Sequence, residues 1–128
     1  MRTYNAQKRG SLLLIKAFVE GVEGRAYPTL LVDTGSAYTL ISQEILESIG
    51  CSPAVPKRTQ RIITGSGYEI VPVVSVSKFH CLGRLLQDFE VLAHTLPFGV
   101  YVDGLLGMDF LGRFEIEIIL RSGSILMK

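Results

Sequence analysis

Short apolar segments, interrupted by glycine and polar residues, recur along the entire chain. Each continues for only about five to eight residues before a break, which is the length of a β-strand and too short for most core helices. The 128 residues, 48% hydrophobic and 20% charged, suffice for one buried core and are not typical of a disordered chain. We therefore predict a single all-β domain over residues 1–128.

Glycine-containing breaks indicate where the strands pair. Residues 21–24, with glycine at both ends, are expected to join strands over 11–20 and 25–32 into a hairpin. Pro28 in the second strand indicates an edge or a bulge. Further pairs are expected at residues 59–64 with 68–76, 78–82 with 85–93 around 83–84, and 115–120 with 124–127, together with loops at 51–57 and 94–102 and a short strand at 105–106.

Two short helices complete the expected architecture. Ser42 is a suitable N-cap for a helix over residues 43–49, which Gly50 would end. A second helix is expected over residues 108–114.

Charge and membrane criteria narrow the possible partners. Thirteen basic and twelve acidic residues give a formal net charge of +1 without a basic block, so nucleic acid is not an expected partner. The apolar run at residues 12–19 is too short to span a bilayer. Membrane attachment would therefore require an anchor outside these residues.

The thiols and imidazoles do not form a metal-binding pattern. Cys51 and Cys81 are too few for a disulfide scaffold and too far apart for a metal site. We interpret them as free thiols in a reducing, cytoplasmic compartment, with a single disulfide as the alternative. His80 and His94 also lack ligand-like spacing, so neither a metal nor another cofactor is expected.

Of the four aspartates, Asp33 has the sequence context that most strongly indicates a functional role. Three apolar residues, 30–32, place it at the end of a strand that should be buried, where a carboxylate is costly without hydrogen bonds or a partner. Thr34, Gly35 and Ser36 offer donors that would favour and orient the ionised form. The alternative is a polar turn after a strand, since these residue types all favour turns.

With its flanks, this segment resembles the active-site loop of the aspartic proteases: Leu-Leu-Val-Asp-Thr-Gly-Ser at residues 30–36 precedes an apolar Thr-Leu-Ile-Ser at 39–42. Two further landmarks follow in the family's order. Thr-Gly-Ser-Gly at 64–67 resembles the flap hairpin that closes over substrate, and Gly-Leu-Leu-Gly-Met-Asp-Phe-Leu at 104–111 resembles the strand and helix of the second half of the fold.

The resemblance covers residues 11–127 and is closer to bacterial and cellular single-domain retropepsin-like proteins than to viral ones. It implies a closed, retropepsin-like β-barrel with one or two short helices, which is half of a pepsin-like fold. It also implies aspartic endopeptidase activity without a cofactor, with Asp33, Thr34 and Gly35 as the catalytic residues.

Peptide hydrolysis by this chemistry needs two carboxylates that share one proton. The chain has one Asp-Thr-Gly and is too short for two lobes, so a C2 homodimer is expected, with Asp33 of both protomers on the axis. The resemblance implies that Thr34 bonds across this axis. It also implies a dimer sheet of terminal strands, from residues 124–127 and, less clearly, 1–8.

A peptide or protein substrate is expected to lie extended between the two aspartates and the hairpin. The residues predicted to contact it are Ser36, Ile63, Gly65, Ser66, Gly67, Tyr68, Leu105 and Leu106. For the larger side chains, a place in the ordinary core is the alternative. Asp109 is expected to cap a helix or to pair with Arg113, four residues further on.

The sequence thus favours an aspartic endopeptidase, most active at acidic pH. The alternative is a retropepsin-like domain that binds peptides or forms a dimer scaffold without cleaving, because a fold does not imply an activity.

Overall fold

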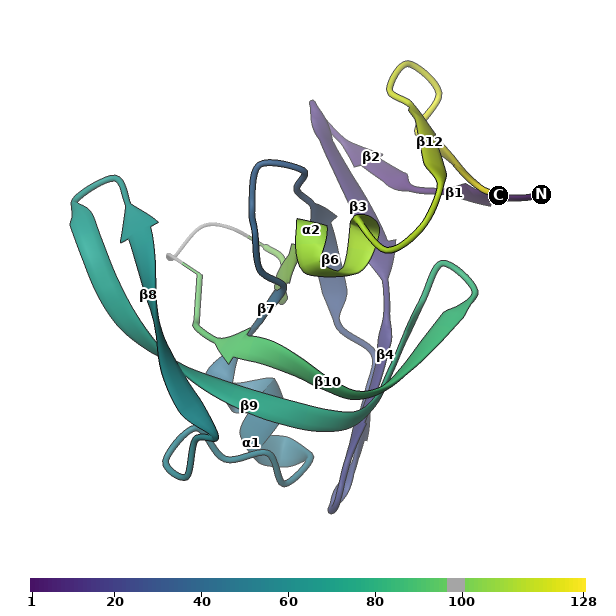
Figure 1. Cartoon of the computed structure of the whole chain (residues 1–128). Helices are drawn as coiled ribbons and strands as arrows, with labels where there is room; N and C mark the ends of the chain where they lie inside the picture. Colours follow the sequence, from purple (N-terminus) through teal and green to yellow (C-terminus); the bar gives the residue numbers. More distant parts are fainter. Residues whose placement is uncertain (97–100) are drawn as a thin grey trace.

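The computed structural model describes residues 1–96 and 101–128. These residues form a mostly β structure with two short helices, which confirms the predicted all-β class (Figure 1). The elements are β1 (Arg2–Asn5), β2 (Gln7–Arg9), β3 (Leu12–Lys16), β4 (Phe18–Gly21), β5 (Gly24–Ala26), β6 (Thr29–Val32), β7 (Leu40–Ile41), α1 (Gln43–Ser48), β8 (Arg58–Thr64), β9 (Gly67–Cys81), β10 (Arg84–Ala93), β11 (Gly104–Leu106), α2 (Met108–Leu111), β12 (Ile116–Ile119) and β13 (Ser124–Met127).

Most strands belong to one large sheet with the order β2-β3-β6-β11-β7-β10-β9-β4-β5, to which β8 adds by pairing with β9. The predicted strand over 11–20 is divided at Ala17 into β3 and β4, and the Ala17 N–H donates to the Pro28 carbonyl at 2.9 Å. β3 pairs with β6, whereas β4, the next strand along the chain, pairs with β9 near the other end of the sheet order. Because β3 and β4 are adjacent in the chain, the two ends of the sheet lie close together and the sheet curls on itself.

The core lies inside this curled sheet and is closed by the two helices. Phe79, Phe89 and Phe110 form its aromatic centre, with ring centroids 4.9 to 6.5 Å apart. Leu46 of α1 is fully buried in the same cluster. The Ser42 side chain accepts a hydrogen bond from the Ile45 N–H, which confirms the predicted N-cap.

Several boundaries differ from the predicted ones for local reasons. The predicted strands 68–76 and 78–82 are the single strand β9, since polar residues at alternate positions leave a strand intact. Its turn to β10 is centred on Leu82 and Gly83, both at positive φ (51° and 73°). This is the geometry of a two-residue hairpin turn. α2 ends at Leu111, before Gly112, and is shorter than the predicted 108–114.

A separate three-stranded sheet with the order β1-β13-β12 joins the two ends of the chain. The β12–β13 hairpin was predicted, whereas residues 2–5 were not clearly recognisable as a strand because they are largely polar. β13 pairs with β1 on one side and with β12 on the other. The predicted loop at 94–102 falls partly outside the described residues. No helix among the described residues is long and apolar enough to cross a membrane.

Candidate functional site

Asp33 stands directly after β6, which lies between β3 and β11 in the large sheet. Its backbone N–H donates to the Leu106 carbonyl of β11 at 3.0 Å, so the neighbouring strand fixes its position. The Gly35 N–H donates to Asp33 Oδ1 at 3.0 Å. A Cβ atom on Gly35 would lie only 3.3 Å from that oxygen, so glycine gives the amide its close approach to the carboxylate.

The neighbouring hydroxyls do not act as predicted. The Ser36 hydroxyl donates to the Tyr38 carbonyl at 2.7 Å and thus closes the loop rather than contacting the Asp33 carboxylate. Thr34 is exposed at the loop tip, and no hydrogen bond of its hydroxyl occurs among the described residues. Gly35 therefore supplies the one donor seen on this carboxylate within the described chain.

A buried network ties the far end of the loop to α2. Thr39, whose side chain is 0% exposed, donates from its hydroxyl to Asp109 Oδ1 at 2.7 Å and from its N–H to Oδ2 at 2.9 Å. The Gly107 N–H in turn donates to the Thr39 hydroxyl at 3.1 Å. Asp109 Oδ1 also accepts from the Phe110 N–H at 2.9 Å within the first turn of α2, whose N-cap residue is Gly107.

The predicted pairing of the Asp109 carboxylate with Arg113 is thus not present in the structure. The Arg113 Nε donates to the Asp109 backbone carbonyl at 2.9 Å, and its guanidinium lies over the Phe89 ring. The carboxylate is engaged by Thr39, because the end of the loop lies against the first turn of α2, where the Met108 and Asp109 N–H groups donate to the Ser36 and Ala37 carbonyls.

Two glycines allow the loop to pass this closely. A Cβ atom on Gly104 would collide with the Leu40 carbonyl oxygen, and one on Gly107 would collide with the Tyr38 carbonyl oxygen. The Met108 N–H also donates to the Ser36 carbonyl at 2.8 Å. The loop over residues 33–39 is therefore held by backbone contacts along its length.

The β8–β9 hairpin forms the opposite wall of the site and extends away from the body of the molecule (Figure 1). Thr64 pairs with Gly67, so residues 65 and 66 make the turn, one residue shorter than the predicted break at 65–67. Ile63 and Tyr68 near the tip are 91% and 64% exposed. The Arg61 guanidinium lies 4.7 Å from the centre of the Tyr68 ring.

A cavity of about 600 Å³ lies between the loop and the hairpin. Of the predicted site residues it is lined by Asp33, Gly35, Ser36, Ile63 and Leu105. The predicted contacts Gly65, Ser66, Gly67 and Tyr68 are not among its lining, because they lie beyond it at the hairpin tip.

Leu106 is a correction to the predicted lining. It is 0% exposed and packs in the core, whereas Leu105 faces the cavity, because alternate residues of β11 point to opposite sides. A core position was the alternative left open for it.

The lining also contains residues that sequence reasoning missed: Ala37, Tyr38, Leu40, Arg61, Ile62 and Leu92. Leu40 and Leu92 are neighbours through the parallel pairing of β7 with β10. No signal within one strand reveals a contact between segments so far apart in the sequence.

The other carboxylates do not supply a second acid to this cavity. Asp103 accepts from the Thr29 N–H at 2.8 Å, Asp109 is held by Thr39, and Asp88 lies at a different cavity. Among the described residues no group of three or more His, Cys, Asp or Glu side chains could hold a metal. One chain therefore contributes one carboxylate, Asp33, to the site.

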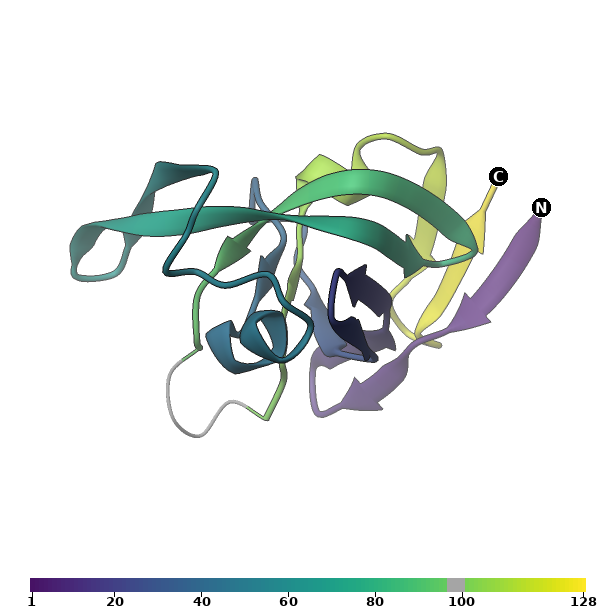
Figure 2. The same cartoon turned by 90° about the horizontal axis from the view of Figure 1, so that it is seen from below.

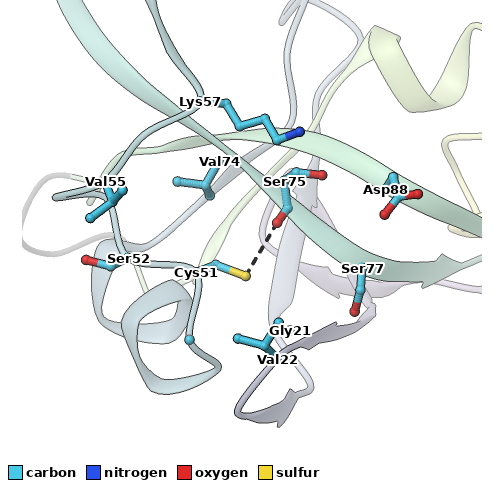
Figure 3. A pocket seen from close by; sticks show the side chains of 11 residues that line it. Gly21, Val22, Cys51, Ser52, Val55, Lys57, Val74, Ser75, Ser77 and Asp88 are labelled. Carbon is cyan, nitrogen blue, oxygen red and sulfur yellow. Dashed lines mark hydrogen bonds between the residues drawn. The ribbon is translucent and has the colours of Figure 1, made fainter.

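A second cavity, of about 500 Å³, contains no residue of the 33–39 loop (Figure 3). The Cys51 thiol points into it and donates to the Ser75 carbonyl at 3.5 Å, with Lys57 and Asp88 on its walls. Burial raises the pKa of the Cys51 thiol and raises the pKa of Cys81 to about 12. Both cysteines are free, as predicted, and neither is poised as a thiolate nucleophile.

Solved structures share this fold. A retropepsin-like aspartic protease from Rickettsia conorii is similar with a TM-score of 0.72 and 22% identity, over 98% of this chain and 99% of that one. The simian foamy virus protease is similar with a TM-score of 0.52 and 23% identity, over 77% of this chain and 91% of that one. The retroviral protease-like domain of Ddi1 from Leishmania major has a TM-score of 0.59 and 14% identity, over 94% of this chain and 90% of that one.

At the level of sequence, no curated protein matches the chain. The pattern of the family described as "gag-polyprotein putative aspartyl protease" matches residues 21–113, which include the Asp33 loop, the hairpin and α2. With the shared fold, this match shows that the chain belongs to the gag-polyprotein putative aspartyl protease family and is retropepsin-like, as its Asp-Thr-Gly segment suggested.

Proposed function

We propose that the chain is an aspartic endopeptidase that acts as a homodimer, with Asp33 of each protomer forming one catalytic pair. The observation that carries this proposal is the single Asp33 carboxylate on the wall of a cavity of about 600 Å³, oriented by the Gly35 N–H. Membership of the aspartyl protease family, matched over residues 21–113 and so over Asp33, supports the proposal.

The proposed chemistry needs a second copy because of proton sharing. Two carboxylates at short range cannot both ionise, so the pair holds one proton between them. The ionised member takes a proton from a bound water, and the protonated member donates a hydrogen bond to the scissile carbonyl. The protons are therefore gained and lost by the pair as a unit and not by either residue alone. Activity is expected at acidic pH, where the singly protonated pair is populated.

Support for the assembly comes from the surroundings of Asp33. Thr34 is exposed and lines a small apolar cavity of about 240 Å³ together with Met108, Phe114, Ile116 and others. An exposed hydroxyl beside apolar side chains suits a contact with a second protomer, in which Thr34 would bond across the axis. No other described carboxylate could take the partner's place.

The substrate proposed for this site is an extended peptide. Leu40, Ile62, Leu92 and Leu105 line the cavity, so apolar side chains would be accepted next to the cleaved bond. The hairpin over residues 58–81 would cover the peptide, and its backbone would hold it by hydrogen bonds.

A non-catalytic peptide-binding domain of the same fold is the second candidate. It is favoured by the fact that one described chain holds only half of the catalytic pair. Mass in solution separates the two: an obligate monomer that binds peptides without cleaving them would support this candidate.

The decisive experiment is cleavage of a peptide library between pH 3 and pH 8 by the wild-type chain and by Asp33→Asn. The variant is expected to keep its thermal unfolding midpoint and its mass in solution while losing cleavage to background. Asp88→Asn, which removes a carboxylate outside the site, is the matched control and should cleave like the wild type. Cleavage by Asp33→Asn at the wild-type rate would overturn the proposal.

A further inference from the structure

Another cavity, of about 370 Å³, lies where the two ends of the described chain meet the turn between β9 and β10. Figure 2 shows this turn close to the N and C ends. The cavity is lined by Met1, Arg2, Tyr4, Leu82, Gly83, Arg84, Met127 and Lys128. None of these residues lines the cavity at Asp33, so the two cavities are separate.

Tyr4 packs the β1 side of this cavity against the turn. Gly83 has a φ of 73°, and a Cβ atom there would collide with the Tyr4 hydroxyl oxygen, so the end of the tyrosine side chain lies directly on the turn backbone. β1 itself is fixed by its pairing with β13. Arg2 and Arg84, which are far apart in the sequence, are thereby brought to one cavity.

Both arginines lie over aromatic rings. The guanidinium carbon of Arg2 lies 5.6 Å from the centre of the Tyr4 ring, and that of Arg84 lies 5.3 Å from the centre of the Phe114 ring. Arg84 Nη2 also donates to the Lys128 carbonyl at 2.9 Å. Such contacts restrict the two side chains before a ligand arrives, which lowers the entropic cost of binding one.

The cavity carries an excess of positive charge. Its lining includes Arg2, Arg84 and Lys128 and, among the described residues, no Asp or Glu. Lys128 Nζ is paired with Glu117 Oε2 at 3.4 Å, whereas neither arginine forms an ion pair with a described carboxylate. Free chain ends would add one charge of each sign and would leave this excess unchanged. Two guanidinium groups without a counter-ion therefore share one cavity.

We infer that this cavity binds a doubly charged oxyanion, a phosphate group or a dicarboxylate, between Arg2 and Arg84. A guanidinium group presents paired N–H donors that match two oxygens of a carboxylate or of a phosphate group. Two such groups balance two negative charges, and the Tyr4 hydroxyl offers a further donor. The bound anion ties β1 to the β9–β10 turn and so stabilises the folded chain.

An NMR titration of the whole chain tests the site with inorganic phosphate and, separately, with succinate. Ionic strength is held constant with sodium chloride, so that general screening of charge does not contribute. The amide signals of Gly83 and Arg84 are expected to shift and to saturate, while that of Gly65 at the hairpin tip stays in place. Saturation with phosphate alone, or with succinate alone, identifies which oxyanion is bound. Saturation with neither overturns the inference.

Charge-removing variants distinguish this site from the general surface charge. Arg84→Gln and Arg2→Gln are each expected to raise the anion dissociation constant at least about tenfold, because each removes charge-assisted hydrogen bonds. Arg25→Gln, which removes an exposed arginine of β5, is the matched control and should bind like the wild type. Unchanged binding in the first two variants, or an equal loss in the control, would contradict the assignment.

Thermal unfolding provides a second measurement. Arg2→Gln is the variant of choice, since Arg2 is exposed and its replacement leaves the Arg84 contacts with Phe114 and Lys128 in place. Phosphate should raise the unfolding midpoint of the wild type more than that of Arg2→Gln. An equal rise in both would come from exclusion of the anion from the protein surface and would count against a site. None of these measurements requires cleavage, so their result is independent of the proposed function.

Discussion

The two walls of the cavity are built in opposite ways. The loop over residues 33–39 is held by backbone contacts and by the buried Thr39–Asp109 pair, and glycines allow its close approach to β11 and α2. The outer part of the β8–β9 hairpin is exposed, with Ile63, Tyr68 and Ile70 at 91%, 64% and 65% exposure, whereas β9 is buried from Val71 onward at alternate positions. One wall is packed like a protein core, and the other has little to pack against.

This difference matches what the proposed chemistry demands of each wall. A catalytic carboxylate must be held in place before substrate arrives, which requires locked neighbours. A covering hairpin must move to admit and release a peptide, which requires few stabilising contacts. We therefore expect mutations in the loop to cost folding stability and mutations in the hairpin to change substrate affinity.

The largest contrast is expected between two glycine-to-alanine changes. In Gly104→Ala the new Cβ atom meets the Leu40 carbonyl, a backbone group that cannot move aside, so the free energy of unfolding should fall by about 3 kcal/mol or more. Gly65→Ala at the hairpin tip meets nothing within 4 Å and should change it by less than about 0.5 kcal/mol. Urea titration of both variants measures the free energy of unfolding. Equal losses in the two variants would contradict the contrast between the packed loop and the exposed hairpin.

An intermediate effect is expected from the buried hydroxyl of Thr39. Thr39→Val leaves the Gly107 N–H and the Asp109 carboxylate each without one partner, so we expect a loss of about 1–3 kcal/mol in the free energy of unfolding. Cleavage should fall as well, because the loop that carries Asp33 is loosened.

Thr59→Val is the control for this change, since Thr59 is an exposed residue of β8. Thermal unfolding and kcat are measured for both variants. A loss at Thr59 as large as that at Thr39 would contradict the view that the hairpin is loosely held.

The smallest effect, and one on substrate affinity alone, is expected at Ile63. Its side chain is almost fully exposed and its residue lines the cavity, so Ile63→Ala should leave the unfolding midpoint unchanged. Under the proposed function it should raise KM about fivefold, through the loss of about 1 kcal/mol of apolar burial against the peptide. Ile70→Ala, from the same hairpin but outside the cavity lining, should leave KM unaltered. An equal rise of KM in both variants would contradict the role assigned to Ile63.

Local patterns were sufficient for the parts of the molecule that depend on neighbours in sequence. The Ser42 cap, a turn within residues 65–67 and the β12–β13 hairpin were predicted because capping and turn formation involve residues only a few positions apart. The polar strand β1 was not clearly predicted, since its place depends on β13 at the other end of the chain.

The sequence by itself determined the all-β class and the motif around Asp33, and it is the source of the expectation that a second carboxylate is needed. These follow from the spacing of apolar runs and from the number of acids, which packing cannot alter. Only the tertiary structure decided that the carboxylate of Asp109 binds Thr39 rather than Arg113, that Leu106 belongs to the core, and that β13 has no free edge. Each of these depends on which distant segments lie side by side, and that is set by the burial of the whole chain rather than by any local pattern.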